Sequence, residues 1–300
     1  MNARTKVMVG YDGSAHAESA IDHLGSAGVT RDAEVLIAWV VKPQWMIPAV
    51  SELDLLSLAS QRAEATLARG SMHRQKVIQH AANLVARAAE RVGSRFPSWT
   101  VSTELLHGDP AEELLGLADE WRPDLVVVGS QGRSAIGRFF LGSVSKRIAG
   151  EAKSSVRVVR SQINRSLDEA PKLVAGARSL DDAERVINTI GRRVWPGGTK
   201  LRLVAVDDGV VPGRVSAMYP YAVEIFTQAT EPLAALGIQV SVEVTSGEPE
   251  TILLQAADSL ETDSIFITAN SAVTRSGRLD ETAQALVTNA TTTVEIVRWN

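Results

Sequence analysis

Three glycines and a serine near the middle of the chain have the spacing of a loop that could hold a phosphate group. The segment from Asp124 to Ser145 reads DLVVVGSQGRSAIGRFFLGSVS, so an apolar run is followed by Gly129, Gly132 and then Gly142-Ser143. Glycine has no Cβ, and its backbone N–H can therefore approach a phosphate closely. The pattern from Val144 to Ala149 predicts a helix, whose first N–H groups would face the same anion. The chemistry expected here is phosphate binding by backbone amides.

The loop belongs to neither of the two most familiar nucleotide-binding motifs. It lacks the Gly-Lys-Ser/Thr of a Walker A loop and the Gly-x-Gly-x-x-Gly of a dinucleotide-binding fold. The full spacing Gly-x2-Gly-x9-Gly-Ser, together with VMVGYDGS near the start of the chain, resembles the nucleotide-binding branch of the universal stress protein family. The resemblance implies a flavodoxin-like α/β sandwich with ATP between the first strand's loop and the glycine loop. The alternative is a strand-to-helix turn without a ligand.

Asp12 is a second candidate for ligand contact. Residues 6–10 predict a short buried strand, and the apolar spacing after Ser14 predicts a helix with Ser14 as its N-cap. Asp12 is therefore expected at the carboxyl end of a strand, where open α/β sheets bind ligands. The resemblance implies that Asp12 contacts the nucleotide near its ribose or a phosphate-bound Mg²⁺, and no other metal ligand is predicted. The alternative is that Asp12 only shapes the turn.

Further site residues follow from the resemblance. It places Trp39 and Val40, at the end of the predicted strand 35–41, beside the adenine, with Val40 acting through its backbone. Packing in the core is the alternative for Trp39. Arg133 and Arg138 could pair with phosphates or be solvated. The complete predicted site is Asp12, Trp39, Val40, Gly129, Gly132, Arg133, Gly142, Ser143 and Val144.

The segments that carry these residues alternate between predicted strands and predicted helices. Further strands are predicted over residues 99–106, 125–128 and 156–159. Such alternation predicts a mostly parallel sheet covered on both faces. The segment 43–70 interrupts the pattern, with a helix predicted over 53–68 before a separate helix over 73–92. This insertion is expected to be a lid over the nucleotide or a subunit contact.

The same order of elements begins again after a polar linker at 161–170. We therefore predict two tandem flavodoxin-like α/β domains, 1–160 and 171–300, each with a mostly parallel five-stranded sheet. The resemblance implies that the last strands, 156–159 and 294–297, pair with each other within the chain, with a homodimer as a further prediction. Such pairing would cover a sheet edge that is otherwise exposed.

The second copy lacks the residues that would hold a phosphate in the first. The alignment places Arg178, Thr268, Ser271 and Glu281-Thr282 opposite Asp12, Gly129, Gly132 and Gly142-Ser143. A Cβ would crowd each amide, and a carboxylate would repel the phosphate. We therefore expect that the second copy does not bind ATP.

Composition narrows the function classes. The chain has 300 residues, a net charge of −4 and no cysteine, so no nucleic-acid partner, disulfide, thiol catalysis or zinc–thiolate site is expected. No leader-like or membrane-spanning apolar run is seen, and a cytoplasmic location is expected. The resemblance implies an ATP-binding, regulatory protein of the stress response, with Mg²⁺ and at most weak ATP hydrolysis. The alternatives are a slow ATPase or transferase, and a structural tandem module without nucleotide.

Overall fold

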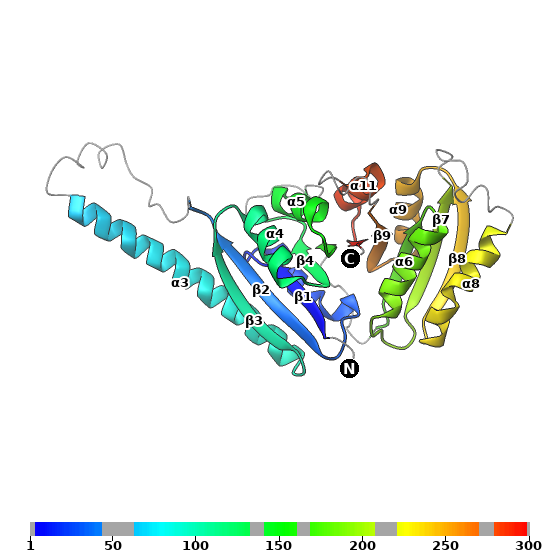
Figure 1. The fold of residues 1–300 in the computed structure, drawn as a ribbon, viewed down its shortest axis with the longest axis horizontal. Coiled ribbons are helices and arrows are strands. Elements are labelled where there is room, and N and C mark those ends of the chain that lie inside the picture. The colour runs from blue at the N-terminus through cyan, green and yellow to red at the C-terminus, as the bar shows by residue number, and fades with distance from the viewer. Residues whose placement is uncertain are drawn as a thin grey trace.

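A computed structural model describes residues 4–43, 63–132, 141–160, 169–207, 221–269 and 279–298, and only the backbone of residues 63–70. Ten strands form one continuous sheet in the order β3-β2-β1-β4-β5-β10-β9-β6-β7-β8 (Figure 1). The strands of the first half are β1 (Thr5–Gly10), β2 (Ala33–Val41), β3 (Thr100–His107), β4 (Leu125–Gly129) and β5 (Ser155–Val159). Those of the second half are β6 (Lys172–Ala177), β7 (Lys200–Asp207), β8 (Gln239–Ser246), β9 (Ser264–Thr268) and β10 (Thr293–Val297).

Helices cover both faces of this sheet. Those of the first half are α1 (Ala15–Asp22), the 3₁₀ turn η1 (Gly25–Ala27), α3 (Ala63–Arg95), α4 (Pro110–Trp121) and α5 (Ser143–Glu151). Those of the second half are α6 (Leu180–Gly191), α8 (Ala222–Ala235), α9 (Pro249–Leu260) and α11 (Glu281–Asn289). No helix in the described ranges has an apolar stretch long enough to cross a membrane.

The strand order creates a switch point in each half. In the first half β1 lies between β2 and β4, and in the second half β6 lies between β7 and β9. All pairings within each half are parallel, which confirms the predicted mostly parallel sheet. Connections that leave a central strand in opposite directions open a crevice at its carboxyl end, and ligands of α/β proteins bind there.

Alternate residues of each strand enter the two core layers. Val7 and Val9 of β1 face α1 and α3, whereas Met8 faces the opposite layer. This opposite layer runs beneath α4, α5, α9 and α11 and includes residues of both halves, so the hydrophobic core is continuous across the molecule. Strands buried on both faces explain the uninterrupted apolar runs seen in the sequence.

The structure corrects the prediction for the segment after β2. The sequence predicts separate helices over 53–68 and 73–92, but α3 runs unbroken from Ala63 to Arg95 through Gly70. One glycine inside a helix costs only about 1 kcal/mol, which the flanking alanine- and arginine-rich turns outweigh. The helix extends beyond the sheet (Figure 1). Residues 44–62 lie outside the described part of the chain, as do residues 161–168 of the predicted linker.

The two halves meet where β5 pairs with β10. This pairing is antiparallel, with Val158 opposite Val294, Arg157 opposite Glu295 and Val156 opposite Ile296. The predicted pairing of the last strands within the chain is therefore present. We refer to this strand pair as the seam.

Two arginines make reciprocal contacts across the seam. Arg160 donates to the carbonyl of Val287 in α11, and Arg298 donates to the carbonyls of Ala149 and Gly150 in α5. Each half thus satisfies carbonyl groups at the end of a helix in the other half.

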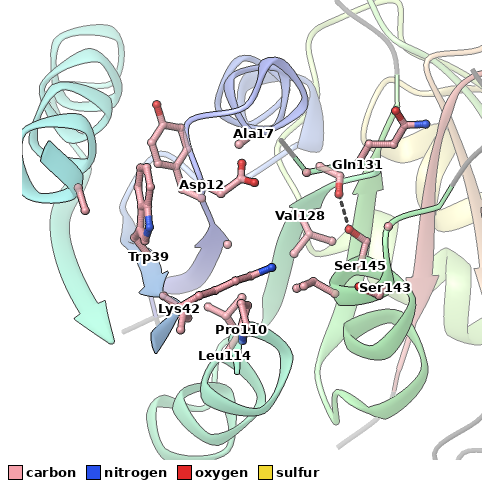
Figure 2. A pocket seen from close by; sticks show the side chains of 18 of the residues that line it. Asp12, Ala17, Trp39, Lys42, Pro110, Leu114, Val128, Gln131, Ser143 and Ser145 are labelled. Atoms are coloured by element: carbon pink, nitrogen blue, oxygen red, sulfur yellow. Dashed lines mark hydrogen bonds between the residues drawn. The ribbon is translucent and has the colours of Figure 1, made fainter. Parts of the chain in front are cut away.

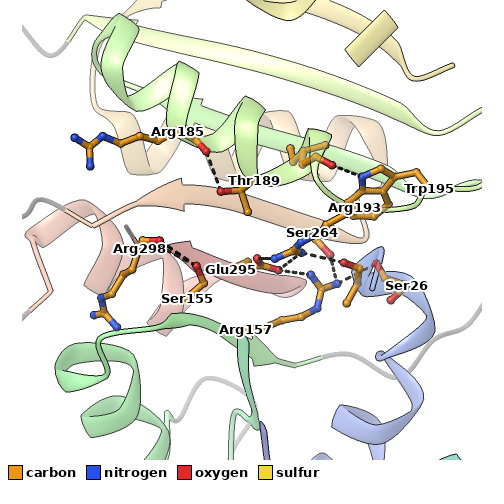
Figure 3. Close-up of polar contacts among 12 residues, drawn as sticks. Ser26, Ser155, Arg157, Arg185, Thr189, Arg193, Trp195, Ser264, Glu295 and Arg298 are labelled. Carbon is orange, nitrogen blue, oxygen red and sulfur yellow. Dashed lines mark hydrogen bonds and ion pairs between the residues drawn. The ribbon is translucent and has the colours of Figure 1, made fainter. Parts of the chain in front are cut away.

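A buried ion cluster lies at the centre of the seam (Figure 3). The side chains of Arg157 and Glu295 are 0% exposed, and Arg157 Nη1 lies 2.9 Å from Glu295 Oε2. Arg193, from the loop after α6, binds both oxygens of the same carboxylate. Burial by itself raises the pKa of Glu295, but Arg193 and Arg157 together hold that pKa below its usual value. Burial lowers the pKa of Arg157.

We expect the ion cluster to make the protein sensitive to acid. The carboxyl of Glu295 has a lower pKa in the folded chain than in the unfolded chain, where glutamate titrates near about 4.3. Its stabilising contribution is therefore complete above that pH and is lost as the pH falls further. In urea unfolding, the stability difference between wild type and Glu295→Gln should shrink from pH 6 to pH 3. A constant difference would contradict the prediction, and the exposed Glu231→Gln serves as the control.

Candidate functional site

A pocket of about 860 Å³ lies at the carboxyl ends of β1, β2 and β4, beside the switch point of the first half (Figure 2). This volume is in the range of small-molecule sites. Among the residues that line it are Asp12, Trp39, Val40, Gly129, Gly132, Gly142, Ser143 and Val144. The structure therefore brings together every predicted site residue except Arg133, which, like Arg138, lies outside the described residues.

Each of the three loop glycines has a different role in the structure. A Cβ on Gly129 would lie 2.6 Å from the backbone carbonyl carbon of His16, so this glycine lets α1 pack against the end of β4. A Cβ on Gly132 would lie 3.0 Å from Asp12 Oδ2 and would fill the space between the two loops. Gly142 donates its N–H to the carbonyl of Ser130 at 2.8 Å. Gly132 is therefore the glycine whose missing side chain leaves room for a ligand.

The start of α5 faces the pocket and has no side-chain cap. The N-cap is Gly142, which has no side chain to bond the helix. Ser143 is the first helical residue and is exposed, and it lines the pocket together with the half-buried Val144. Because the first amides of a helix lack internal acceptors, the start of α5 presents N–H groups and a positive dipole end to the pocket.

Two serines that sequence reasoning did not assign to the site hold its loops in place. Ser145 is buried and donates to the carbonyl of Gly129 at 2.6 Å (Figure 2). Ser14 caps α1 by accepting from Ala17 N at 3.2 Å, as predicted, and donates to the carbonyl of Gln131 at 3.4 Å. The position of Ser145, three residues before the buried Ile148 on one helix face, is the signal that could have revealed it.

The position of Asp12 is compatible with both roles considered for it, which are shaping the turn and contacting a ligand. Its Oδ1 accepts a hydrogen bond from Ser14 N at 2.9 Å and so shapes the turn after β1. Its Oδ2 lies on the side of Gly132, within the pocket. No group of three or more histidine, cysteine, aspartate or glutamate side chains that could hold a metal occurs in the part of the chain that the structure describes.

Trp39 belongs to the core and also borders the pocket. It is 2% exposed and contacts Tyr11 edge to face, with 5.9 Å between ring centroids. The Tyr11 hydroxyl donates to Glu18, and burial followed by this contact raises the pKa of Tyr11. The alternative of core packing is therefore correct for the body of the indole, while part of the residue lines the pocket.

The side of the pocket formed by β2 and α3 is a basic wall whose residues are not among the predicted site residues. We define this basic wall as Lys42, His73, Lys76 and His80. Figure 2 shows the Lys42 side chain extending from the end of β2 into the pocket. Among the described residues that line the pocket, Asp12 is the only acid. The spacing of residues 73, 76 and 80 places them on one helix face, which is the signal that could have identified them.

The corresponding place in the second half is nearly filled. A cavity of only about 20 Å³ remains there, next to Arg178, Asp182 and Asp280. Arg178 Nη2 lies 3.1 Å from Asp280 Oδ2, and Thr268 Oγ1 donates to Asp182 at 2.6 Å. Side chains that pair with one another thus take up the space that the first half leaves open.

The structure also corrects the alignment of the two halves by one residue. Gly142 is the N-cap of α5 and Asp280 is the N-cap of α11, so Asp280 stands opposite Gly142, and Glu281 stands opposite Ser143. The sequence alignment had placed Glu281 opposite Gly142. The Asp280 side chain accepts from Ala283 N, a bond that Gly142 has no side chain to make.

Comparisons with known proteins agree with this geometry. The family model described as "Universal stress protein family" matches residues 3–160. Universal stress protein MJ0531 of Methanocaldococcus jannaschii is 30% identical over 161 residues, which is 53% of this chain and 84% of that protein. Universal stress protein Rv1636 of Mycobacterium tuberculosis is 30% identical over 162 residues, 54% of this chain and 99% of that protein. The crystal structure of a universal stress protein from Archaeoglobus fulgidus superposes with a TM-score of 0.64 at 17% identity, covering 98% of this chain and 96% of that one.

The fold and the pocket define a flavodoxin-like α/β protein with a ligand-sized cavity at the carboxyl ends of its strands. The family match covers more than half of the 300 residues. The chain belongs to the universal stress protein family.

We expect Gly129→Ala to destabilise the fold, because its Cβ would overlap the backbone of His16 and force α1 away from β4. Overpacking of this kind costs about 1–3 kcal/mol. The matched control is Gly116→Ala in α4, where a Cβ meets nothing within 4 Å and where alanine favours the helix. Urea unfolding of both variants measures the effect. Equal stabilities would contradict the packing role of Gly129.

Proposed function

We propose that the pocket of the first half binds ATP together with Mg²⁺, and that the protein acts as a nucleotide-dependent regulatory protein of the stress response. The observation that carries this proposal is the coincidence of the glycine loop, the start of α5 and Asp12 around one cavity of about 860 Å³. The proposed contacts are Asp12, Trp39, Val40, Gly129, Gly132, Arg133, Gly142, Ser143 and Val144. The proposed domains are 1–160 and 171–300, joined by a linker at 161–170.

The phosphates would rest on backbone amides. The open space over Gly132, which a Cβ would reduce, and the N–H groups at the start of α5 supply donors without a charged side chain. Asp12 Oδ1 is engaged by Ser14, so the carboxylate has a fixed orientation and would contribute one ligand to a phosphate-bound Mg²⁺. Leu114 and Val40 offer apolar surface to the base.

The basic wall supports a polyphosphate ligand. Lys42 and Lys76 bring positive charge to a pocket in which Asp12 is the only acidic residue among the described lining residues. Opposite charges attract most strongly where solvent is partly excluded. A nucleoside triphosphate with Mg²⁺ therefore suits this pocket better than an uncharged nucleoside.

We propose binding with at most weak hydrolysis. Efficient hydrolysis needs a group that positions or deprotonates water, together with stabilisation of the developing charge. The single described carboxylate of the pocket, Asp12, is hydrogen-bonded within its own turn. The second half is proposed not to bind ATP, because the Arg178–Asp280 pair occupies the corresponding space.

Calorimetric titration of nucleotide-free protein with ATP and Mg²⁺ tests the proposal. We expect one site per chain and at least about tenfold weaker binding for Gly132→Val, because the new side chain would occupy the space beside Asp12. Gly197→Val is the control, since a Cβ at this surface-loop glycine meets nothing within 4 Å. Two sites per chain would contradict the assignment to the first half, and unchanged binding by Gly132→Val would contradict the loop's role.

The basic wall gives a second test of ligand charge. We expect Lys76→Ala to weaken ATP binding by about fivefold, the effect of one partly exposed ion pair, and to leave adenosine binding unchanged. Lys200→Ala, at the start of β7, removes the same charge away from the pocket. Equal losses for ATP and adenosine would show that Lys76 acts through packing, and the effect on ATP should diminish at high salt.

A further inference from the structure

The two paired strands of the seam are symmetric except at their centre. Both β5 and β10 have five residues, and the third residue of one strand faces the third residue of the other, Arg157 opposite Glu295. Val156 and Val158 on one strand correspond to Val294 and Ile296 on the other. If two β5 strands paired in the same register, Arg157 would face a second Arg157.

The surroundings of the central pair would otherwise permit such self-pairing. The neighbouring positions are apolar in both strands, and the arginines that follow them, Arg160 and Arg298, make equivalent contacts with the opposite half. Backbone pairing and hydrophobic contact therefore do not distinguish a β5 partner from a β10 partner. The charge at the centre does.

Arg157 depends on the second half for its charge partner. Its guanidinium is 0% exposed and contacts Glu295 Oε2 at 2.9 Å and Ser264 Oγ at 2.6 Å, both in the second half. Within its own half the guanidinium donates to the carbonyl of Ser26 at 3.4 Å, and that oxygen carries no charge. A buried charge that loses its partner is strongly destabilising, and two buried guanidiniums opposite each other add repulsion.

A second contact, beside the strands, is equally one-sided. The loop after α6 lies against the turn that follows η1, where Val194 N donates to the carbonyl of Gly28 at 2.9 Å. Gly28 has a φ of +65°, and a Cβ there would lie 2.7 Å from the ring of Trp195. Arg193 Nη1 also donates to the carbonyl of Ala27 at 2.9 Å. The first half thus provides a surface without a side chain, and the second half provides the aromatic ring that covers it.

We propose that the seam edge of the first half is specific for one kind of partner, a strand with a central carboxylate together with an arginine–tryptophan loop, and that it rejects a second copy of itself. Two copies of the chain can then associate through this edge only if the first half of each copy pairs with the second half of the other copy. The proposal concerns protein association and is independent of the proposed ATP binding.

A pair of complementary full-length variants tests this specificity. Arg157→Glu reverses the charge of the first half, and Glu295→Arg/Arg193→Glu reverses the charges of the second half. Within either variant like charges face each other across the seam. In a mixture, the first half of each variant meets an oppositely charged second half only in the other variant. One chain of each variant would therefore form a complex with two seams.

Mass measurement in solution and thermal unfolding provide the readouts. We expect an equimolar mixture, refolded together, to form a 1:1 complex that melts above either variant alone. Self-association of Arg157→Glu or of the double variant to the same extent as the mixture would overturn the proposal. A mixture without a 1:1 complex would also overturn it, including the case in which the separate variants do not fold. Mixing Arg157→Glu with the surface variant Glu231→Arg is the control, and it should give no hetero-complex.

The contact between Gly28 and the ring of Trp195 can be tested independently, because Gly28→Ala leaves all charges in place. We expect this variant to lower the melting temperature of the full chain more than Gly237→Ala, where φ is also positive (+80°) but a Cβ meets nothing within 4 Å. An equal effect of the two substitutions would show that backbone strain alone accounts for it, and the loop contact would then be removed from the proposed specificity.

Discussion

The antiparallel hydrogen bonding of β5 to β10 joins the two halves of the molecule. It turns two five-stranded arrays into one sheet and removes two strand edges that would otherwise be exposed. It also lets the hydrophobic layer beneath α4, α5, α9 and α11 continue from one half to the other. Because the seam buries charged groups as well as apolar ones, it contributes specificity of strand pairing in addition to buried surface area.

The halves share strand order but differ in what lies at the switch point. In the first half Asp12 and Gly132 face each other across open space, whereas in the second half Arg178 and Asp280 close it with an ion pair. The same backbone plan therefore supports a ligand-sized cavity in one half and a packed, internally satisfied surface in the other. The second half contacts the first through the seam, and the open pocket lies in the first half.

One segment of the first half connects the two features. It begins at Asp12 and Ser14, which border the pocket or join its loops, continues through α1 and ends at Ala27 and Gly28, which contact the second half. Helix α1 therefore links the turn that borders the pocket to the part of the first half that contacts the second.

Hydrophobic period and glycine spacing are local properties, and from them the sequence alone predicted the alternation of strands and helices and their repeated order. The gathering of Asp12, Gly129, Gly132 and Gly142 at one place was implied by the resemblance to the universal stress protein family. The tertiary structure was needed to reveal the basic wall formed by the end of β2 and by α3, the cap at Gly142, the one-residue shift to Asp280 and the pairing of Arg157 with Glu295. These features join residues far apart in the chain, and which side chains meet depends on strand register and helix packing, which no local pattern encodes.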